Sequence, residues 1–356
     1  MKAVLIMIVL ENKNVFMVIN MTNRITIHDV AKAANVSIAT VSKALNGVDV
    51  VKPATKKRIL ETAEKLHYVP NVMGKQLKSG RTKMLGFYTN TISGPYFSPL
   101  VEAMAKEAER LGYGINVFIT NDKQIITNSI RGNMVDGIIG FEDLIDEQEL
   151  EAIKREKIKA VFIDRRTCSE TIGSVVFDSF QTGQTATNYL LTKGHQRIAF
   201  VLGFEGVYDS DERFKGYQAA LSNAKISFDK DIVLQGSFEE KDAYHAVQEF
   251  LKQDAVEKPS AFLAGNDLSA IGVIKGLRDL GYQVPQDFSV IGFDGIDLLE
   301  YFEPRLTTIE NPIEQQAQLA VQHLIALITG EQEGQSFELS GKLLEGQSVK
   351  KYKEKE

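Results

Sequence analysis

The chain has 356 residues, which is enough for two or three compact units that each bury their own core. Its composition is that of an ordinary soluble globular protein, and its single cysteine, Cys168, excludes an intramolecular disulfide and fits the reducing cytoplasm. The net charge of −6 is unevenly distributed, because residues 21–83 carry 12 Lys and Arg against 4 Asp and Glu. Residues 1–20 add one positive charge, so residues 84–356 carry −15. A basic segment ahead of an acidic body indicates that this segment meets phosphate.

The first twenty residues do not fit the rest of the chain. Their apolar run AVLIMIVL is eight residues long, too short to span a bilayer, and the polar ENKN follows it. Lys2 and this run are compatible with a signal peptide, but no small-x-small cleavage site follows. We therefore expect residues 1–20 to be an extra segment, produced by an upstream translation-start artefact or added as a tail.

The segment 26–46, TIHDVAKAANVSIATVSKALN, predicts two short helices joined by a tight turn. Its apolar residues recur at helical spacing, in two groups: Ile27, Val30, Ala31 and Ala34, then Val41, Ala44 and Leu45. Thr26 and Asp29 have the spacing of a capping box. Asn35 can adopt the left-handed conformation that ends the first helix, and Ser37 can cap the second.

A third apolar stripe follows at Ile59, Ala63 and Leu66, with Pro53 suited to the first turn of its helix. Two short helices bury little area alone, so we expect them to pack steeply against this third helix, as in a helix-turn-helix unit. The second helix would then turn small or polar side chains toward a DNA major groove: Ile38, Ala39, Ser42, Lys43 and Asn46. A generic three-helix scaffold with no DNA role fits the helical pattern equally well.

Two long runs in this region, ITIHDVAKAANVSIATVSKALNG and VKPATKKRILETAEKLHYVPN, closely resemble the N-terminus of LacI/GalR family transcriptional regulators, and the resemblance covers about residues 24–348. It implies that the second helix reads operator bases through Ile38, Ala39 and Lys43. The full set of residues expected to bind DNA is Thr26, Ser37, Ile38, Ala39, Thr40, Ser42, Lys43, Asn46, Thr55, Tyr68, Asn71 and Leu77.

Residues 71–82, NVMGKQLKSGRT, contain two glycines that weaken a helix, so a plain linker is the simplest interpretation. The resemblance instead implies a hinge helix that orders on operator DNA, pairs with its dimer mate and wedges Leu77 into the minor groove. Gly74 stands where the family usually has alanine. This departure should raise the entropic cost of ordering the hinge by about 1 kcal/mol per chain.

From Met84 onward, short apolar strands alternate with amphipathic helices. The strands are expected at 84–89, 115–120, 136–141, 159–164, 197–203, 260–265 and 288–293. This alternation predicts parallel sheets, and a stretch of about 270 residues is best divided into two doubly wound subdomains. Small ligands bind such sheets beyond the carboxyl ends of the strands.

The resemblance agrees with that prediction, since the family core is two-lobed and similar to periplasmic binding proteins. We expect an α/β chain with a helix-turn-helix headpiece at 24–70, a hinge at 71–82 and a core at 83–350. One subdomain would hold about 83–178 and 311–338, the other about 179–310 and 339–350. The chain would cross between them near Asp178, Glu310 and Leu339.

Polar side chains follow several of the predicted strands: Asp164, Asn266, Asp267 and Asp294. Each of them alone would more often cap the next helix. Together they predict a polar cluster at one cleft. Carboxylates and amides pair well with the vicinal hydroxyls of a sugar, whereas a phosphate ligand would require more cationic groups.

Arg213 lies in the run DSDERFKGYQAAL, which predicts the start of an amphipathic helix, and a weak surface ion pair with Asp209 or Glu212 is its simplest interpretation. The resemblance instead matches Arg213 to an arginine that reaches the effector. It implies effector contacts for Asn266, Asp294 and Asp164, and stacking on a sugar ring for Phe238, although a core phenylalanine fits nearly as well.

The run TNTISGPYFSPL resembles the family loop that lines the N-terminal side of the cleft, so Tyr96 and Phe97 would form an aromatic wall. The effector-binding set is therefore Tyr96, Phe97, Asp164, Arg213, Phe238, Asn266 and Asp294. Asn311 and Ile313 occupy positions that vary across the family. The effector stays unidentified, and a sugar or sugar phosphate is the preferred class.

Three other functions compete with this interpretation. An enzyme is disfavoured because nucleotide-binding glycine motifs, G-x-S-x-G and H-E-x-x-H are absent and the five histidines are scattered, so we expect no cofactor and no metal. A solute-binding receptor for transport would share the two-lobed body but has no use for a helix-turn-helix. A catabolite-control regulator acting with a phosphorylated carrier protein is compatible with the sequence.

The sequence thus predicts a cytoplasmic repressor of carbohydrate uptake or catabolism genes that does not bind membranes. It would bind double-stranded operator DNA as a homodimer, since a two-fold protein reads a near-palindromic site. The tail LLEGQSVKKYKEKE lacks a leucine heptad, so no tetramerisation helix is expected. An effector that closes the lobes would bias the hinge and relieve repression, although the sequence does not set the sign.

Overall fold

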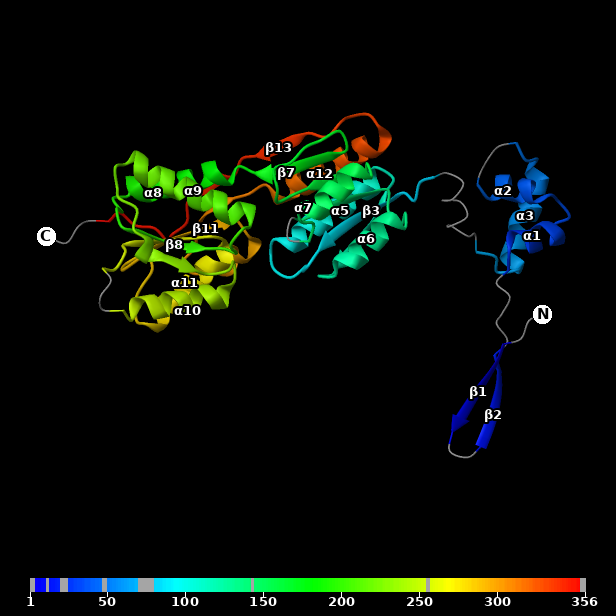
Figure 1. The fold of residues 1–356 in the computed structure, drawn as a ribbon, viewed down its shortest axis with the longest axis horizontal. Coiled ribbons are helices and arrows are strands. Elements are labelled where there is room, and N and C mark those ends of the chain that lie inside the picture. Colours follow the sequence, from blue (N-terminus) through cyan, green and yellow to red (C-terminus); the bar gives the residue numbers. More distant parts are fainter. Residues whose placement is uncertain are drawn as a thin grey trace. The chain divides into compact units, whose positions relative to one another are not determined.

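The computed structural model describes residues 4–10, 13–19, 25–46, 50–69, 80–141, 144–253 and 257–352. The chain divides into two units, Met1–Gly80 and Arg81–Glu356. The first unit contains a two-stranded hairpin and a helical headpiece, and the second contains two parallel-dominated sheets (Figure 1). Within the described residues, no helix is both long enough and apolar enough to cross a bilayer.

Three helices form the headpiece, namely α1 (Ile27–Ala33), α2 (Ile38–Leu45) and α3 (Pro53–Lys65). The predicted start and stop signals are confirmed. The Asp29 carboxylate accepts hydrogen bonds from the Thr26 N–H (2.8 Å) and hydroxyl (2.7 Å), and Asn35 is left-handed with φ 50°. Ser37 caps α2 by accepting the Thr40 N–H at 3.2 Å. The helices bury one small core of Val30, Ala31, Ala34, Val41, Ala44, Ile59 and Ala63.

The sheet of the N-terminal lobe has the strand order β13-β7-β6-β5-β3-β4, with all neighbours parallel. Its strands are β3 (Met84–Thr89), β4 (Gly114–Ile119), β5 (Gly137–Gly140), β6 (Ala160–Phe162), β7 (Ile172–Phe177) and β13 (Ser336–Leu339). Helices α5 (Phe97–Arg110) and α12 (Ile313–Thr329) cover one face, where Phe87, Leu100 and Leu324 are buried. Helices α6 (Lys123–Arg131) and α7 (Glu147–Arg155) cover the other.

The sheet of the C-terminal lobe has the order β14-β12-β11-β10-β8-β9, and only β14 runs antiparallel to its neighbour. Its strands are β8 (Ile198–Leu202), β9 (Val233–Gln235), β10 (Ala261–Ala264), β11 (Ser289–Asp294), β12 (Thr307–Glu310) and β14 (Lys342–Leu344). Helices α8 (Ser179–Thr192) and α9 (Tyr208–Asn223) lie on one face (Figure 1). Helices α10 (Glu240–Leu251) and α11 (Asp267–Asp279) lie on the other, and short 3-10 turns η1 (Lys230–Ile232) and η2 (Asp297–Tyr301) complete the lobe.

The chain passes between the two sheets three times. It leaves the N-terminal lobe after β7, returns after β12 to form α12, and crosses again between β13 and β14. Both sheets are doubly wound, because each has helices packed on both faces. The alternation of short apolar strands and amphipathic helices therefore predicted the correct class of fold.

Residues 4–10 and 13–19 form an antiparallel pair, β1 (Val4–Leu10) and β2 (Lys13–Ile19), with Val4 opposite Ile19. No secondary structure was predicted here, because the apolar run was weighed only as a membrane span or export signal and then assigned to an extra segment. The high β propensity of Val, Ile and Phe was the available signal. The origin of residues 1–20 as an extra segment stays a prediction.

Candidate functional site

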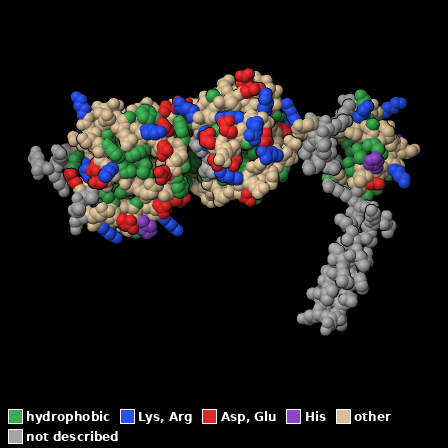
Figure 2. Space-filling view, in the orientation of Figure 1, with side chains coloured by type: hydrophobic (Ala, Val, Ile, Leu, Met, Phe, Trp, Pro, Cys, Tyr) green, Lys and Arg blue, Asp and Glu red, His purple; other side chains and the backbone are tan. Residues whose placement is uncertain are grey.

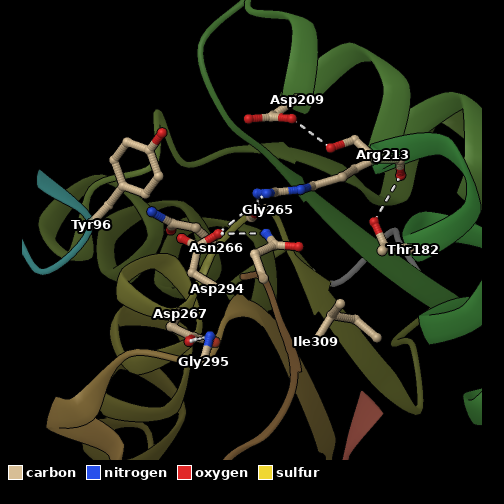
Figure 3. A network of polar contacts seen from close by, with 12 residues as sticks. Tyr96, Thr182, Asp209, Arg213, Gly265, Asn266, Asp267, Asp294, Gly295 and Ile309 are labelled. Atoms are coloured by element: carbon tan, nitrogen blue, oxygen red, sulfur yellow. Dashed lines mark hydrogen bonds and ion pairs between the residues drawn. The ribbon is translucent and has the colours of Figure 1, made fainter. Parts of the chain in front are cut away.

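One cavity of about 320 Å³ lies where the carboxyl ends of the strands of both lobes meet. Its size is at the lower end of the range for small-molecule sites. All seven residues expected to contact an effector line it, from both lobes: Tyr96, Phe97, Asp164, Arg213, Phe238, Asn266 and Asp294. Figure 3 shows Tyr96 facing Arg213, Asn266 and Asp294 across this space.

Arg213 is a buried anchor rather than a surface cation. It lies on α9 with 3% of its surface exposed, where its Nη1 donates to the Gly265 carbonyl at 2.7 Å and its Nη2 to Asp294 Oδ1 at 3.2 Å. The guanidinium lies 4.8 Å from the centre of the Phe293 ring. Among the described residues Arg213 pairs with Asp294 rather than with Asp209 or Glu212: Glu212 pairs with Lys215, and Asp209 accepts from the Ser179 hydroxyl. Burial and fixed hydrogen bonds hold this guanidinium in one orientation.

Asp294 ends strand β11 with φ 109°, an uncommon conformation for a residue with a side chain. Its Oδ1 accepts from Arg213 and, at 3.3 Å, from Asn311 Nδ2. Burial raises the pKa of Asp294 to about 6; the Arg213 guanidinium opposes this and the Asp209 carboxylate adds to it. Asp294 is therefore a carboxylate at neutral pH that is close to accepting a proton.

Asn266 and Asp267 follow strand β10, and the capping role applies to Asn266. Its Oδ1 accepts the Ser269 N–H (2.8 Å) at the start of α11, while its Nδ2 donates to the Phe238 carbonyl (3.0 Å).

Asp267 is fully buried and does not line the cavity. It accepts hydrogen bonds from Gly295 N (2.7 Å), Ile296 N (3.1 Å) and the Thr308 hydroxyl (2.6 Å). Asp267 thus holds the turn that follows Asp294 and is a positioning residue.

Replacing Asp267 with alanine should destabilise the core by about 2–4 kcal/mol, because three donors would lose their acceptor in a buried place. Urea denaturation of the full chain measures this change. The matched control is Asp297→Ala, an exposed carboxylate on the same turn, which should alter stability by less than about 0.5 kcal/mol. Equal effects of the two substitutions would contradict the positioning role.

Tyr96 and Phe97 form the wall contributed by the N-terminal lobe, with ring centroids 5.3 Å apart in an edge-to-face arrangement. The Tyr96 hydroxyl donates to Gln316 Oε1 at 3.0 Å, and Gln316 in turn donates to the carbonyls of Ile163 and Val175. Burial raises the pKa of Tyr96 well above its usual range, and the carboxylates of Asp209, Asp164 and Asp294 raise it further. Asp164 lies beyond strand β6, is buried, and caps no helix.

Phe238 lines the opposite wall in a left-handed conformation, with φ 56°. A Cβ at Gly203 would lie 2.2 Å from the Phe238 ring, so the ring occupies the space that a side chain at this position would fill. The neighbouring Phe204 is 49% exposed and meets Phe238 edge to face at 6.2 Å between centroids. Phe238 is therefore half-buried at the rim of the cavity rather than part of a closed core.

Several polar residues of this site were not among the expected effector contacts, and three of them make hydrogen bonds that shape it. Asp209 lines the cavity and accepts from the Ser179 hydroxyl at 2.5 Å, and its position four residues before Arg213 on one helix was an available signal. Asn311 orients Asp294, and Gln316 orients Tyr96. Their partners lie 17 and 220 residues away in the chain, so sequence spacing could not identify them.

The headpiece presents the residues expected to read DNA. On α2, Ile38, Ala39 and Lys43 are exposed while Thr40 and Ser42 are half-buried, and Asn46 is exposed at the C-terminal cap of this helix. Thr26 and Ser37 are exposed at helix caps, and Thr55 and Tyr68 are half-buried. Figure 2 shows Lys and Arg side chains on the visible face of the headpiece. Asn71, Gly74 and Leu77 lie outside the described residues, so the hinge helix stays a prediction.

Comparison with known proteins assigns both parts of the chain. Residues 26–71 match the model of bacterial regulatory proteins of the lacI family, and residues 187–349 match a periplasmic binding protein-like domain. Catabolite control protein A of Priestia megaterium is 34% identical over 81% of this chain and 88% of its own length. The chain belongs to the LacI family. It is a DNA-binding transcriptional regulator with the headpiece and two-lobed core that the sequence predicted.

Two further comparisons agree with this LacI-family assignment. The probable HTH-type transcriptional repressor ExuR of Bacillus subtilis is 33% identical over 86% of this chain and 92% of its own length. The solved structure of the transcriptional regulator CelR in complex with cellobiose is 26% identical, with a TM-score of 0.70, over 91% of this chain and all of that chain. These relatives are transcriptional regulators. Within the described residues, no group of three or more His, Cys, Asp or Glu side chains is placed so that it could hold a metal ion.

Proposed function

We propose that this LacI-family regulator represses genes of carbohydrate uptake or catabolism and releases its operator when a sugar-class effector binds between the lobes. The observation that carries the proposal is the cavity itself, which joins aromatic walls to an oriented Arg213–Asp294 pair. Such a pair offers both donors and an acceptor to neighbouring hydroxyls. The related regulator CelR was solved with cellobiose, which supports the same ligand class here.

The coupling between sites is proposed to run through lobe closure. The cavity takes residues from both lobes, and Tyr96 of the N-terminal lobe faces Asp209 and Arg213 of the C-terminal lobe. An effector that contacts both walls therefore favours whichever lobe geometry brings them together. In a homodimer, a change of lobe geometry would alter the spacing of the two headpieces and weaken their simultaneous grip on an operator of two half-sites.

Binding of the full chain to a labelled duplex from its own upstream region tests this function. We expect saturable binding, and an unrelated duplex should be a poor competitor for it. The affinity should fall steeply as the salt concentration rises, because phosphate contacts release counterions. A panel of sugars and sugar phosphates is then added to the complex at fixed salt. A folded protein that prefers no upstream duplex, with or without any panel member, would contradict the proposal.

Effector binding should weaken as pH falls below about 6. The pKa of Asp294 is raised by burial to about 6, above its ordinary value of 3.8, so the free folded protein takes up this proton as the pH falls through about 6. An effector hydroxyl that donates to the Asp294 carboxylate would require it ionised, so affinity should drop by up to about tenfold per pH unit below the inflection. Calorimetric titration from pH 5 to 8 with the sugar of the panel that binds most tightly measures this change in affinity.

The control for this pH profile is Asp209→Asn, which removes a carboxylate that raises the pKa of Asp294. The inflection should then move to lower pH while its shape is retained. A profile that is flat from pH 5 to 8 in the unsubstituted protein would show that the ligand does not use the ionised Asp294.

A further inference from the structure

The charges around the cavity are strongly unbalanced. Among the described residues that line it, four are acidic and one is basic: Asp164, Asp209, Glu239 and Asp294 against Arg213. Asp164 is 8% exposed, so its carboxylate is poorly screened by solvent. The low-dielectric walls of a cleft focus the field of such groups into its interior.

The single cation is already used within the protein. Arg213 donates one hydrogen bond to the Gly265 carbonyl and another to Asp294, and that ion pair cancels its charge at short range. A guanidinium has five N–H donors and these two hydrogen bonds use two of them, so donors remain for a ligand oxygen. Arg213 is therefore equipped to orient a hydroxyl, whereas an anionic group would have to compete with Asp294 for it.

From this balance we infer that the effector carries no phosphate or carboxylate group, and that it is an uncharged sugar or a cationic amino sugar. The inference rests on the proposed function, and it narrows the ligand class within the same cavity. A phosphate or uronate in this space would lie among the four lining carboxylates, and Arg213, the single cation of the described lining, is already bonded to Asp294. Hydroxyl groups instead satisfy carboxylates as donors and Arg213 as acceptors.

The sign of the cavity field can be measured without knowing the effector. Phe204 lines the cavity and is half exposed, so Phe204→Cys in a Cys168→Ser background places one thiol there. Its reaction rates are compared for a trimethylammonioethyl and a sulfonatoethyl methanethiosulfonate of similar size. The exposed Cys168 of the unsubstituted protein supplies the reference ratio of the two reagents. Val207→Cys is the second position if the first variant does not fold.

We expect the cationic reagent to be favoured at the cavity thiol by about tenfold or more relative to the reference, and this preference to shrink at high salt. Asp164→Asn should reduce the preference, whereas Glu151→Gln, an exposed carboxylate outside the cavity, should not. An equal ratio at the two thiols, or a preference for the sulfonate, would overturn the inference.

A second experiment compares matched sugars. Each neutral sugar of the panel is tested by thermal shift beside its own phosphate, uronate and amino derivative. We expect the neutral or amino member to stabilise the full chain more than its anionic partners do. An anionic member that stabilises it more than its neutral counterpart would overturn the inference. A cavity that favours the cationic reagent in a protein whose operator binding responds to no sugar would leave the inference intact and contradict the proposed function.

Discussion

Replacing Arg213 with alanine should abolish the release of operator DNA by effector while leaving operator binding intact. The guanidinium is the oriented donor of the cavity, and without it Asp294 keeps only the longer hydrogen bond from Asn311. A ligand would then lose its donor and meet an uncompensated carboxylate. Mobility shift of the upstream duplex, with and without the effective sugar, measures both properties of the variant in one assay.

The same substitution should lower the stability of the core, since removing one partner of a buried ion pair costs about 3–5 kcal/mol. Arg213→Ala combined with Asp294→Asn removes both charges and should recover part of that stability but none of the response. Lys215→Ala is the matched control, because it removes an exposed cation from the same helix, and it should change neither property. A normal sugar response in a folded Arg213→Ala protein would show that the cavity is not the effector site.

Replacing Lys43 with alanine should weaken operator binding by about 1–3 kcal/mol, or about 5- to 150-fold, with effector affinity unchanged. Lys43 is exposed on α2, the helix that a helix-turn-helix places in the major groove, where a lysine can donate to guanine acceptors. The loss should be larger on the operator than on an unrelated duplex. Fluorescence anisotropy with both duplexes gives the two affinities.

Lys65→Ala is the control for Lys43, because it removes an equal charge from the last turn of α3 while α2 is kept. It should weaken binding to both duplexes alike, by a small factor that grows at low salt. If Lys43→Ala also lowered both affinities equally, Lys43 would be a phosphate contact and the recognition surface would have to be placed elsewhere on the headpiece.

The sequence predicted the two parts of the fold well because each is built from local signals. Capping residues such as Ser37 and the left-handed Asn35 mark helix ends within a few residues, so local residue patterns were enough to place the helices of the headpiece. The core strands are continuous apolar runs buried on both faces, and this pattern is typical of strands in parallel sheets. By contrast, β13 and β14 are short edge strands without such runs, and only the family resemblance indicated a crossing there.

The residues that line the cavity were largely predictable, their hydrogen-bond partners were not, and their contacts with an effector stay a prediction. Residues after strands share one edge of each sheet, which explains why Asp164, Asn266 and Asp294 line a common cavity. The partner of Arg213 was not predictable, because Asp294 lies 81 residues further on and nearer acids offered a simpler pairing. Asn266 shows that capping and cavity lining are compatible, since its amide caps α11 while the residue faces the cleft.

The central claim is that a single coupling free energy links sugar binding in the cavity to operator binding by the headpiece. Its most direct test compares the affinity of the effective sugar for the free full-length protein with its affinity for the operator complex. Linkage requires that the sugar bind the operator complex more weakly by the same factor by which it weakens operator binding. We predict a matching pair of factors in the range of about 5- to 150-fold. Equal sugar affinities for the free protein and the operator complex would contradict the account.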